Sequence, residues 1–269
     1  MKAVAYILLL VVTAVMLFPF LFMVATACKD EAQLAQPEML PQGAWHFENF
    51  PTAWGKAQFN RYLVNSTAVG LATTLLTLLL ASMAGFALSK YRFKGRDVIF
   101  LAILSTLMVP QQVTMIPNFL TCSRIGLLDS LTGLVIPVLP LSFGIFLMRQ
   151  FIRGVPDDLI AAARIDGASD LRIFFQLVMP LCIPALAALG VFTFMASWNG
   201  FLWPLIILDT PEKYTLPIGL MRFSQQFSVE QNHLMAVSIL ITLPVLILFV
   251  VFQRAFIRGL TVGGLSDEG

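Results

Sequence analysis

The amino-acid sequence predicts an all-α integral membrane protein with six membrane-spanning helices. Of its 269 residues, 58% are hydrophobic and only 12% are charged, whereas about a quarter of the residues in soluble domains are charged. The charges are also segregated, because charge-free runs cover residues 3–28, 62–89, 98–123, 130–148, 173–208 and 231–253. A spanning helix needs roughly 20 apolar residues and satisfies its own backbone hydrogen bonds, so each run can supply one span.

The runs place the spans in order along one transmembrane domain, residues 1–269. We expect them at about residues 4–27, 63–89, 98–121, 131–151, 174–198 and 234–257. The charge-free runs behind the second, fourth and sixth spans end at Lys90, Arg149 and Arg254. The run 173–208 is longer than one span requires, so its ends must lie outside the hydrocarbon.

The first run has a second possible interpretation. Lys2, an apolar stretch and the sequence Ala25-Thr26-Ala27-Cys28 resemble a secretory or lipoprotein signal with its cleavage site. However, the stretch is about 25 residues long, longer than a signal core, and Pro19 interrupts it. Because five further runs follow, we expect a retained span.

The distribution of lysine and arginine predicts the orientation. With a cytoplasmic N-terminus, the inside segments hold 11 of the 17 basic residues and the outside segments hold 6. The inside residues are Lys2, Lys90, Arg92, Lys94, Arg96, Arg149, Arg153, Arg164, Arg172, Arg254 and Arg258. The positive-inside rule therefore places both termini in the cytoplasm.

Several kinds of chemistry find no support in the sequence. There is no G-x-x-x-x-G-K-[ST] phosphate loop and no HExxH or clustered His/Cys motif, so we expect this chain to bind neither ATP nor a metal and not to be an enzyme by itself. His46 and His233 both belong to the predicted outer side. The centres of the spans lack the charged residues that proton-coupled carriers usually keep as relays. The energy for any pumping must come from a partner.

The three cysteines are Cys28, Cys122 and Cys182, and they show no metal or redox spacing. Cys28 and Cys122 both fall near the predicted outer surface, which makes a disulfide conceivable. Packing as small apolar residues between helices is the simpler expectation.

The most informative polar segment is Val155 to Pro184, on the predicted cytoplasmic side. Pro156 suits the first position of a helix, and Asp157 and Asp158 complement the positive end of its dipole. Four residues at i, i+3, i+4 and i+7 share one face of this helix: Leu159, Ala162, Ala163 and Asp166. Such an alanine face permits close approach of another backbone, which belongs either to a partner or to this protein's own bundle.

The sequence also indicates where this helix ends. Gly167 fits a left-handed C-terminal cap. Ser169 or Asp170 can then cap the helix that continues into the fifth span.

The same segment resembles the cytoplasmic loop motif of binding-protein-dependent ABC transporter permeases, an EAA pattern followed by a glycine. The form ARIDGAS, followed by a span with proline, resembles the carbohydrate-uptake branch, the family of the maltose-type permease. Other motifs of this branch occur in the family's order: Tyr62-Leu63-Val64-Asn65-Ser66, Tyr91-Arg92-Phe93-Lys94-Gly95-Arg96, Met108-Val109-Pro110, Met115-Ile116-Pro117, Trp198-Asn199-Gly200-Phe201-Leu202-Trp203-Pro204-Leu205, Tyr214-Thr215-Leu216-Pro217-Ile218-Gly219-Leu220, Phe252-Gln253-Arg254 and Arg258-Gly259-Leu260-Thr261. The short N-terminus and six spans resemble the smaller of the two permease subunits.

The resemblance implies a mechanism and a set of partners. In such transporters the loop helix, here about residues 156–167, is a coupling helix that docks in a cleft of a cytoplasmic ATPase. Two ATPase subunits use ATP and Mg²⁺ to rock two homologous permease subunits between inward- and outward-facing states, while an extracytoplasmic solute-binding protein delivers the sugar. The implied location is the lipid bilayer of a bacterial or archaeal plasma (inner) membrane, without a nucleic-acid partner. The residues that match the docking motif are Leu159, Ala162, Ala163, Arg164, Ile165, Asp166, Gly167 and Ala168. Ala161 belongs to the same docking helix but departs from the motif.

The chain departs from the family at two places. The glutamate of the motif falls at position 161, where this chain has alanine. A partly exposed ion pair is worth about 0–1 kcal/mol, so we expect docking to survive, with Asp158 or Asp166 compensating. The tail Gly259 to Gly269 ends in acidic residues where the family often ends in a basic one, so its insertion between the ATPases is less expected.

The translocation path is marked by prolines and by amide and aromatic side chains. Pro110, Pro117, Pro180 and Pro184 interrupt or bound spans, and irregular backbone in membranes usually lines a cavity or is buried. Six polar or aromatic residues near the outer ends of spans could contact substrate: Gln111, Gln112, Asn118, Trp198, Asn199 and Trp203. The tryptophans could equally be interface anchors, and the amides helix caps.

Other functions remain open from the sequence. The same ABC family includes permeases for glycerol phosphate and other polar solutes. A secondary carrier would need coupling residues in the membrane and two similar halves, and neither is found. A channel or structural subunit would need no coupling helix.

Overall fold

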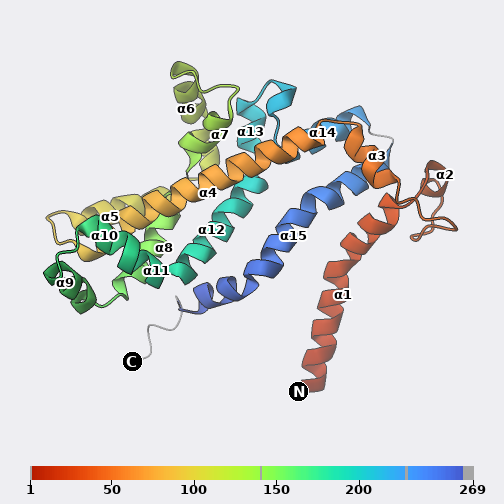
Figure 1. Cartoon of the computed structure of the whole chain (residues 1–269). Helices are drawn as coiled ribbons and strands as arrows, with labels where there is room; N and C mark the ends of the chain where they lie inside the picture. Colours follow the sequence, from red (N-terminus) through yellow and green to blue (C-terminus); the bar gives the residue numbers. More distant parts are fainter. Residues whose placement is uncertain (1, 140, 228–229, 263–269) are drawn as a thin grey trace. The chain divides into compact units, whose positions relative to one another are not determined.

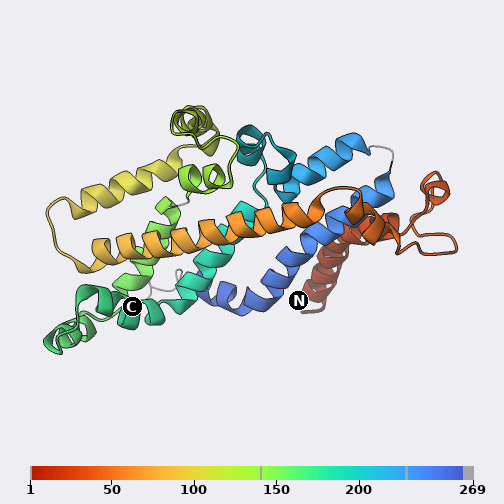
Figure 2. The same ribbon diagram turned by 45° about the horizontal axis from the view of Figure 1, so that its top comes forward.

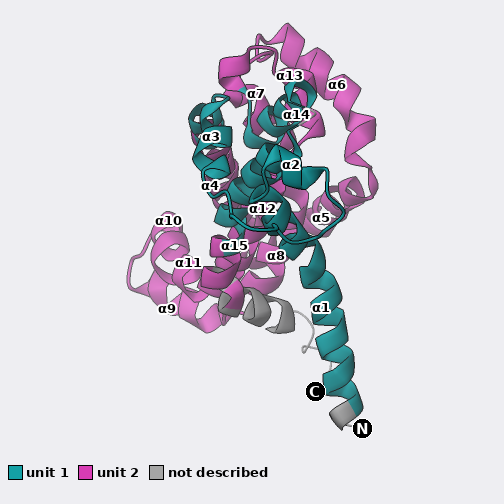
Figure 3. Ribbon diagram, turned by 90° about the vertical axis from the view of Figure 1, so that its right-hand side faces the viewer, with its two compact units in different colours: residues 1–63, 214–246 teal, residues 64–213, 247–269 magenta. Residues whose placement is uncertain are grey.

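The computed structural model describes residues 2–139, 141–227 and 230–262 of the chain (Figure 1). These residues form helices joined by turns and loops, with no strand among them, which confirms the predicted all-α class. They fall into two compact units, unit 1 (residues 1–63 and 214–246) and unit 2 (residues 64–213 and 247–269), coloured teal and magenta in Figure 3. The acidic end of the tail, with Asp267 and Glu268, lies outside the described residues.

Unit 1 begins with the long helix α1 (Lys2–Ala27), which is apolar on all sides. Its large side chains are exposed along most of its length, from Val4 (68%) to Phe22 (44%). A helix that is apolar all round fits a membrane rather than water. The other helices of this unit are α2 (Glu31–Leu34), α3 (Asn49–Gly55), the start of α4 (Phe59–Lys90), α14 (Leu216–Gln226) and the first part of α15 (Gln231–Val262).

The core of unit 1 is aromatic. Phe59 at the start of α4 is fully buried, and its ring lies 5.6 Å from the ring of Tyr62 and 5.5 Å from that of Phe223 in α14. Leu216 and Val237 are also fully buried. Aromatic pairs at such distances contribute about 0.5–1.5 kcal/mol each beyond burial of their area, so this cluster fixes α14 on the first turns of α4.

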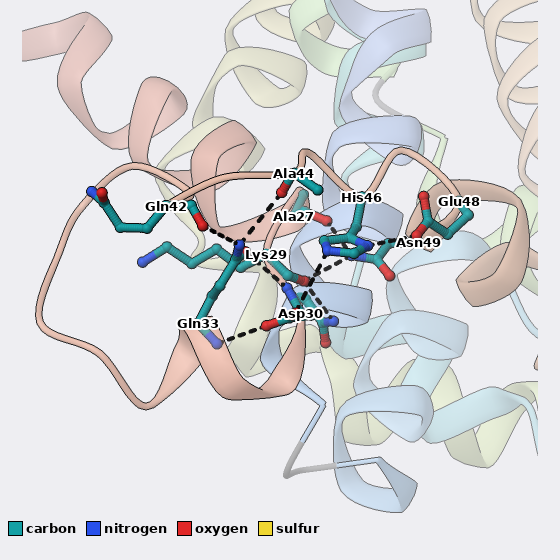
Figure 4. A network of polar contacts seen from close by, with 10 residues as sticks. Ala27, Lys29, Asp30, Gln33, Gln42, Ala44, His46, Glu48 and Asn49 are labelled. Atoms are coloured by element: carbon teal, nitrogen blue, oxygen red, sulfur yellow. Dashed lines mark hydrogen bonds and ion pairs between the residues drawn. The ribbon is translucent and has the colours of Figure 1, made fainter.

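A polar cluster fixes the connection that follows α1 (Figure 4). The side-chain amide of Asn49 donates to the carbonyls of Ala27 (2.8 Å) and Lys29 (2.9 Å), and that of Asn232 donates to Lys29 as well (3.0 Å). The last carbonyls of a helix have no partner within the helix, so these amides satisfy the end of α1. His46 lies between the carboxylates of Asp30 and Glu48 on the same connection.

Unit 2 contains most of the remaining helices. They are the rest of α4, α5 (Arg96–Ser105), α6 (Gln111–Arg124), α7 (Leu131–Val135), α8 (Leu141–Arg153), α9 (Asp157–Ile165), α10 (Asp170–Ile173), α11 (Met179–Leu181), α12 (Ile183–Trp198) and α13 (Leu202–Ile207). Single 3-10 turns cover Thr106–Met108, Ile136–Val138 and Pro211–Lys213, and a π-helical turn covers Phe174–Val178.

Three helices among the described residues are long and apolar enough to cross a membrane unbroken: Val4–Ala27, Phe59–Lys90 and Gln231–Val251. Three bent pairs of helices meet the same test only when each pair is taken together. The pair Arg96–Met108 and Gln111–Arg124 meets at 101°, so that α6 is seen nearly end-on beside α5 in Figure 2. The pair Asp170–Leu181 and Ile183–Trp198 meets at 81°. The structure therefore contains three to six candidate spans.

Not every proline breaks a helix. The break before α6 follows from Pro110, because the preceding Val109 takes an extended conformation (φ −84°, ψ 117°) and helices usually end before such a residue. Pro117, by contrast, lies inside the continuous helix α6, as Pro19 lies inside α1. The sequence pattern identified the break at Pro110, but it did not separate that proline from Pro117.

The core of unit 2 joins α4, α8, α9, α10 and α12. It includes Phe86, Met148, Ile152, Ile160, Ile173, Phe174, Val178 and Leu189, all at most 5% exposed. The three cysteines of the chain, which lie in the two units, are buried free thiols.

Candidate functional site

The helix predicted from the sequence within Val155 to Pro184 is α9, Asp157–Ile165. Pro156 was expected in the first helical position. It lies instead in the position before the helix, with an extended ψ of 134°. Asp157 and Asp158 form the acidic first turn, which suits the positive end of the helix dipole.

The C-terminal end of α9 is a complete two-bond cap. Gly167 adopts φ +81°, its N–H donates to the carbonyl of Arg164 (3.0 Å), and the N–H of Ala168 donates to that of Ala163 (3.0 Å). This pair of bonds is the Schellman motif, which needs a left-handed residue at its turn. The prediction that Gly167 forms a left-handed C-terminal cap is confirmed. Ser169, rather than Asp170, caps the next helix by accepting a bond from the Arg172 N–H.

One side of α9 is packed and the other is bare. Ile160 is 4% exposed and belongs to the core of unit 2, where burial of such a side chain contributes about 1.5–3 kcal/mol. Leu159 is 45% exposed and Ile165 is 87% exposed. Ala161 and Ala162 are exposed, while Ala163 and Ala168 are half-buried against the core. The predicted face is thus exposed at three of its four positions, Ala163 being the exception.

The charges of this region divide into paired and unpaired groups. Lys90 Nζ donates to Asp157 Oδ1 (2.7 Å), and Arg164 donates to Asp170 Oδ1 through Nη2 (3.1 Å) and Nε (3.3 Å). Asp158 and Asp166 are exposed, and neither takes part in an ion pair within the described part of the chain. These two carboxylates are therefore available to a partner.

The pKa values follow the pairing. The hydrogen bond from Lys90 holds the pKa of the Asp157 carboxyl below its usual value. The hydrogen bond to Asp170 raises the pKa of the Arg164 guanidinium. Arg164 also lies over the ring of Tyr91 at 5.8 Å. Arg164 belongs to the docking motif, but its guanidinium group binds residues of this protein, Asp170 and Tyr91.

The comparisons with known proteins agree with this geometry. Residues 77–262, which include α9, match the family described as the binding-protein-dependent transport system inner membrane component. The chain belongs to this family. It is a permease subunit of an ABC importer. The arabinooligosaccharides transport system permease protein AraQ of Bacillus subtilis is 37% identical over 254 residues, covering 93% of this chain and 90% of that protein.

Two further relatives support the assignment. The sn-glycerol-3-phosphate transport system permease protein UgpE of Shigella flexneri is 37% identical over 256 residues, covering 92% of this chain and 91% of that protein. A chain of a bacterial ABC transporter involved in the import of the acidic polysaccharide alginate has a similar structure, with a TM-score of 0.86 and 26% identity over 95% of this chain and 96% of that chain.

The residues predicted to line the permease's translocation path fall in two places. Gln111 and Gln112 are the exposed first residues of α6, and Asn118 is half-buried in the same helix. Asn199 is exposed at the C-terminal end of α12, where it is the capping residue.

The two tryptophans of this set are buried. Trp198 is 3% exposed and stacks on Phe194 with ring centroids 5.5 Å apart. Trp203 is 5% exposed, and its indole N–H donates to the carbonyl of Gly133 (3.0 Å). In this conformation both rings support the backbone of the permease and present no open face.

A polar cluster around Asp129 was missed from the sequence. Its carboxylate accepts bonds from the N–H groups of Asp209 and Thr210 (3.0 Å each), from the Thr210 hydroxyl (2.6 Å) and from Lys213 Nζ (2.7 Å). The bonds from Lys213 and Thr210 hold the pKa of Asp129 far below its usual range. Asp129 has φ +49°, uncommon for a residue other than glycine. A single aspartate between two apolar runs gives no sequence signal for such a cluster.

Proposed function

We propose that this permease is one of two homologous membrane subunits of an ATP-driven importer, with six spans and both termini in the cytoplasm. The excess of lysine and arginine in the predicted inside loops supports this orientation. The three unbroken helices support this count, which is reached when each of the three bent pairs is taken as one span. The importer lies in the plasma membrane of a bacterium or archaeon, and a solute-binding protein serves its outer side.

The coupling element is α9, and its bare apolar side carries the proposal. Leu159 (45% exposed), Ala162 and Ile165 (87% exposed) together form an apolar surface on α9 away from the buried Ile160 (4%), and a contiguous apolar surface favours contact with a partner. We assign Leu159, Ala162 and Ile165 to contact with a cytoplasmic ATPase that binds ATP and Mg²⁺. Ala161 leaves space where the family has a carboxylate, and Asp158 and Asp166 supply the negative charge instead.

The ATPase partner can be tested by co-purification. Ile165→Asp places a charge in the centre of the proposed contact and should remove the ATPase from the purified permease. Ile165→Leu keeps the apolar surface and serves as the matched control. Retention of the ATPase by both variants would contradict the docking role of α9.

For the solute we propose a sugar, most simply a short neutral oligosaccharide. The similarity to the arabinooligosaccharide permease supports this class, and the exposed amides of Gln111, Gln112 and Asn199 can hydrogen-bond hydroxyl groups. Glycerol phosphate is the second candidate, since UgpE is equally similar at 37% identity. Uptake of labelled arabinotriose and of labelled sn-glycerol 3-phosphate by cells with and without the permease distinguishes the two.

A further inference from the structure

Lys90 is the last residue of α4, a long helix that lies in unit 2 from residue 64 onward, and its side chain is buried. Its side chain is only 5% exposed, while the side chain of its partner Asp157 is 80% exposed. Lysine at the end of a membrane helix usually extends toward water. The side chain of Lys90 instead packs against the start of α9.

The ammonium group of Lys90 makes two bonds there. Nζ donates to the backbone carbonyl of Val155 (2.5 Å) and to Asp157 Oδ1 (2.7 Å). A buried charge without partners is strongly unfavourable, so these acceptors fix the position of the side chain. Val155 precedes α9 by two residues, and Asp157 is its first residue, so both acceptors lie at the start of this helix. The end of α4 is thereby bonded to the beginning of α9.

The residue that follows α4, Tyr91, meets the other end of α9. Tyr91 lies under the guanidinium of Arg164, 5.8 Å from the ring centroid, and Arg164 in turn binds Asp170 after the glycine turn. Residues 90 and 91 thus contact both ends of a helix 67–73 residues later in the chain. Covalent connections lead from α9 only to α8 and α10.

We propose that Lys90 is a positioning residue that couples α9 to α4. Movement imposed on α9 passes through the Lys90 bonds directly into α4, in addition to the covalent routes through α8 and α10. This rests on the proposed function of α9. It adds that docking and transmission reside in different residues: the exposed side of α9 binds the ATPase, and Lys90 passes the movement on.

The first test replaces Lys90 with methionine, which keeps the length of the side chain and removes its charge and donors. In the assembled transporter with its partners, we expect Lys90→Met to retain the ATPase but to lower the arabinotriose transported per ATP hydrolysed by about tenfold or more. Asp157→Asn, which removes the charge at an exposed position but keeps an acceptor for Lys90, should give a smaller loss of the same kind. A normal ratio in Lys90→Met would overturn the proposal.

Chemical rescue separates transmission from a general defect in folding. In Lys90→Cys, reaction with 2-aminoethyl methanethiosulfonate restores an ammonium near the position of Nζ. The native cysteines Cys28, Cys122 and Cys182 are fully buried, whereas residue 90 is half-buried at the end of α4, so labelling favours the new thiol. We expect coupling to return to within about twofold of the Lys90 protein, and the uncharged ethyl reagent to restore nothing. Equal rescue by both reagents would contradict a role for the charge.

A measurement without solute completes the test. A spin label at the exposed position 75 of α4 should change its mobility when ATP and vanadate are added, and Lys90→Met should abolish that change. An unchanged response in Lys90→Met would overturn the proposal. Loss of the ATPase from Lys90→Met would also overturn it, because Lys90 would then support docking rather than transmission. The docking role of α9 is tested separately, because retention of the ATPase by Ile165→Asp would contradict that role alone.

Discussion

Gly219 lies so close to Tyr62 that a Cβ atom at position 219 would come within 2.2 Å of the ring's Cδ2 atom. Gly219 is on α14 and Tyr62 on the first turns of α4, and both are buried in unit 1. The absence of a side chain at 219 therefore sets how closely these two helices approach.

Gly219→Ala should consequently destabilise unit 1. The added methyl group must displace the Tyr62 ring from its contact with Phe59, at a cost of about 1–3 kcal/mol typical of overpacking. Thermal unfolding in detergent measures the effect. In the double variant with Tyr62→Leu the penalty should shrink by at least half, and equal penalties in both backgrounds would show that the Tyr62 contact is not the cause.

Gly167→Val should uncouple ATP hydrolysis from transport without affecting membrane insertion. No heavy atom lies near the Cβ position, so the effect comes from the backbone: φ is +81°, where residues other than glycine are strained by about 1–2 kcal/mol. Gly167→Asn is the matched control, because asparagine tolerates this conformation best. We expect transport per ATP to fall severalfold with valine and little with asparagine. Equal loss in both would point to a contact at position 167 instead.

The sequence was sufficient to predict this turn because its determinants are local. Pro156, the acidic pair, the alanines and Gly167 each act within a few residues, so α9 could be placed to within two residues, and its cap identified, without tertiary information. The all-α class was accessible for a similar reason, since apolar runs of spanning length allow few alternatives.

The contacts of Lys90 and Trp203 could not be derived in that way. Lys90 was counted among the basic residues of the predicted inside segments, yet the burial of its side chain depends on the placement of a helix more than sixty residues later. Trp203 was a candidate for sugar stacking, but its N–H binds the carbonyl of Gly133, 70 residues earlier. Nor could the sequence separate Pro110, where the helix breaks, from Pro117, where it continues, because the outcome depends on what replaces the missing hydrogen bond.

Asp129→Asn should lower stability at neutral pH and have little effect in acid. The folded-state pKa of Asp129 is depressed, so its stabilising contribution is present above the unfolded pKa of about 3.9 and is lost as the pH falls below that toward the folded value. The loss of charge-assisted bonds suggests about 2 kcal/mol at pH 7, or about 5 °C in unfolding temperature.

The comparison of unfolding temperatures at pH 7 and near pH 2, where the difference should be clearly smaller, checks this expectation. Glu212→Gln, an exposed carboxylate in the same segment, serves as the control and should have little effect at either pH. A difference between the native protein and Asp129→Asn that stays constant from pH 7 to pH 2 would exclude the ionised carboxylate as the source of stability.

Ala161→Glu should strengthen ATPase binding by restoring the family's carboxylate on the exposed side of α9. The new charge would lie one turn from Ile165, and exposed ion pairs contribute about 0–1 kcal/mol, so we expect at most a roughly fivefold gain in affinity. The gain should fall as salt is raised toward about 1 M, where the Debye length is near 3 Å. Ala161→Gln has the same size without the charge and should leave affinity nearly unchanged. An equal gain with glutamine, or a gain insensitive to salt, would mean that contact area at position 161, and not a missing ion pair, limits docking.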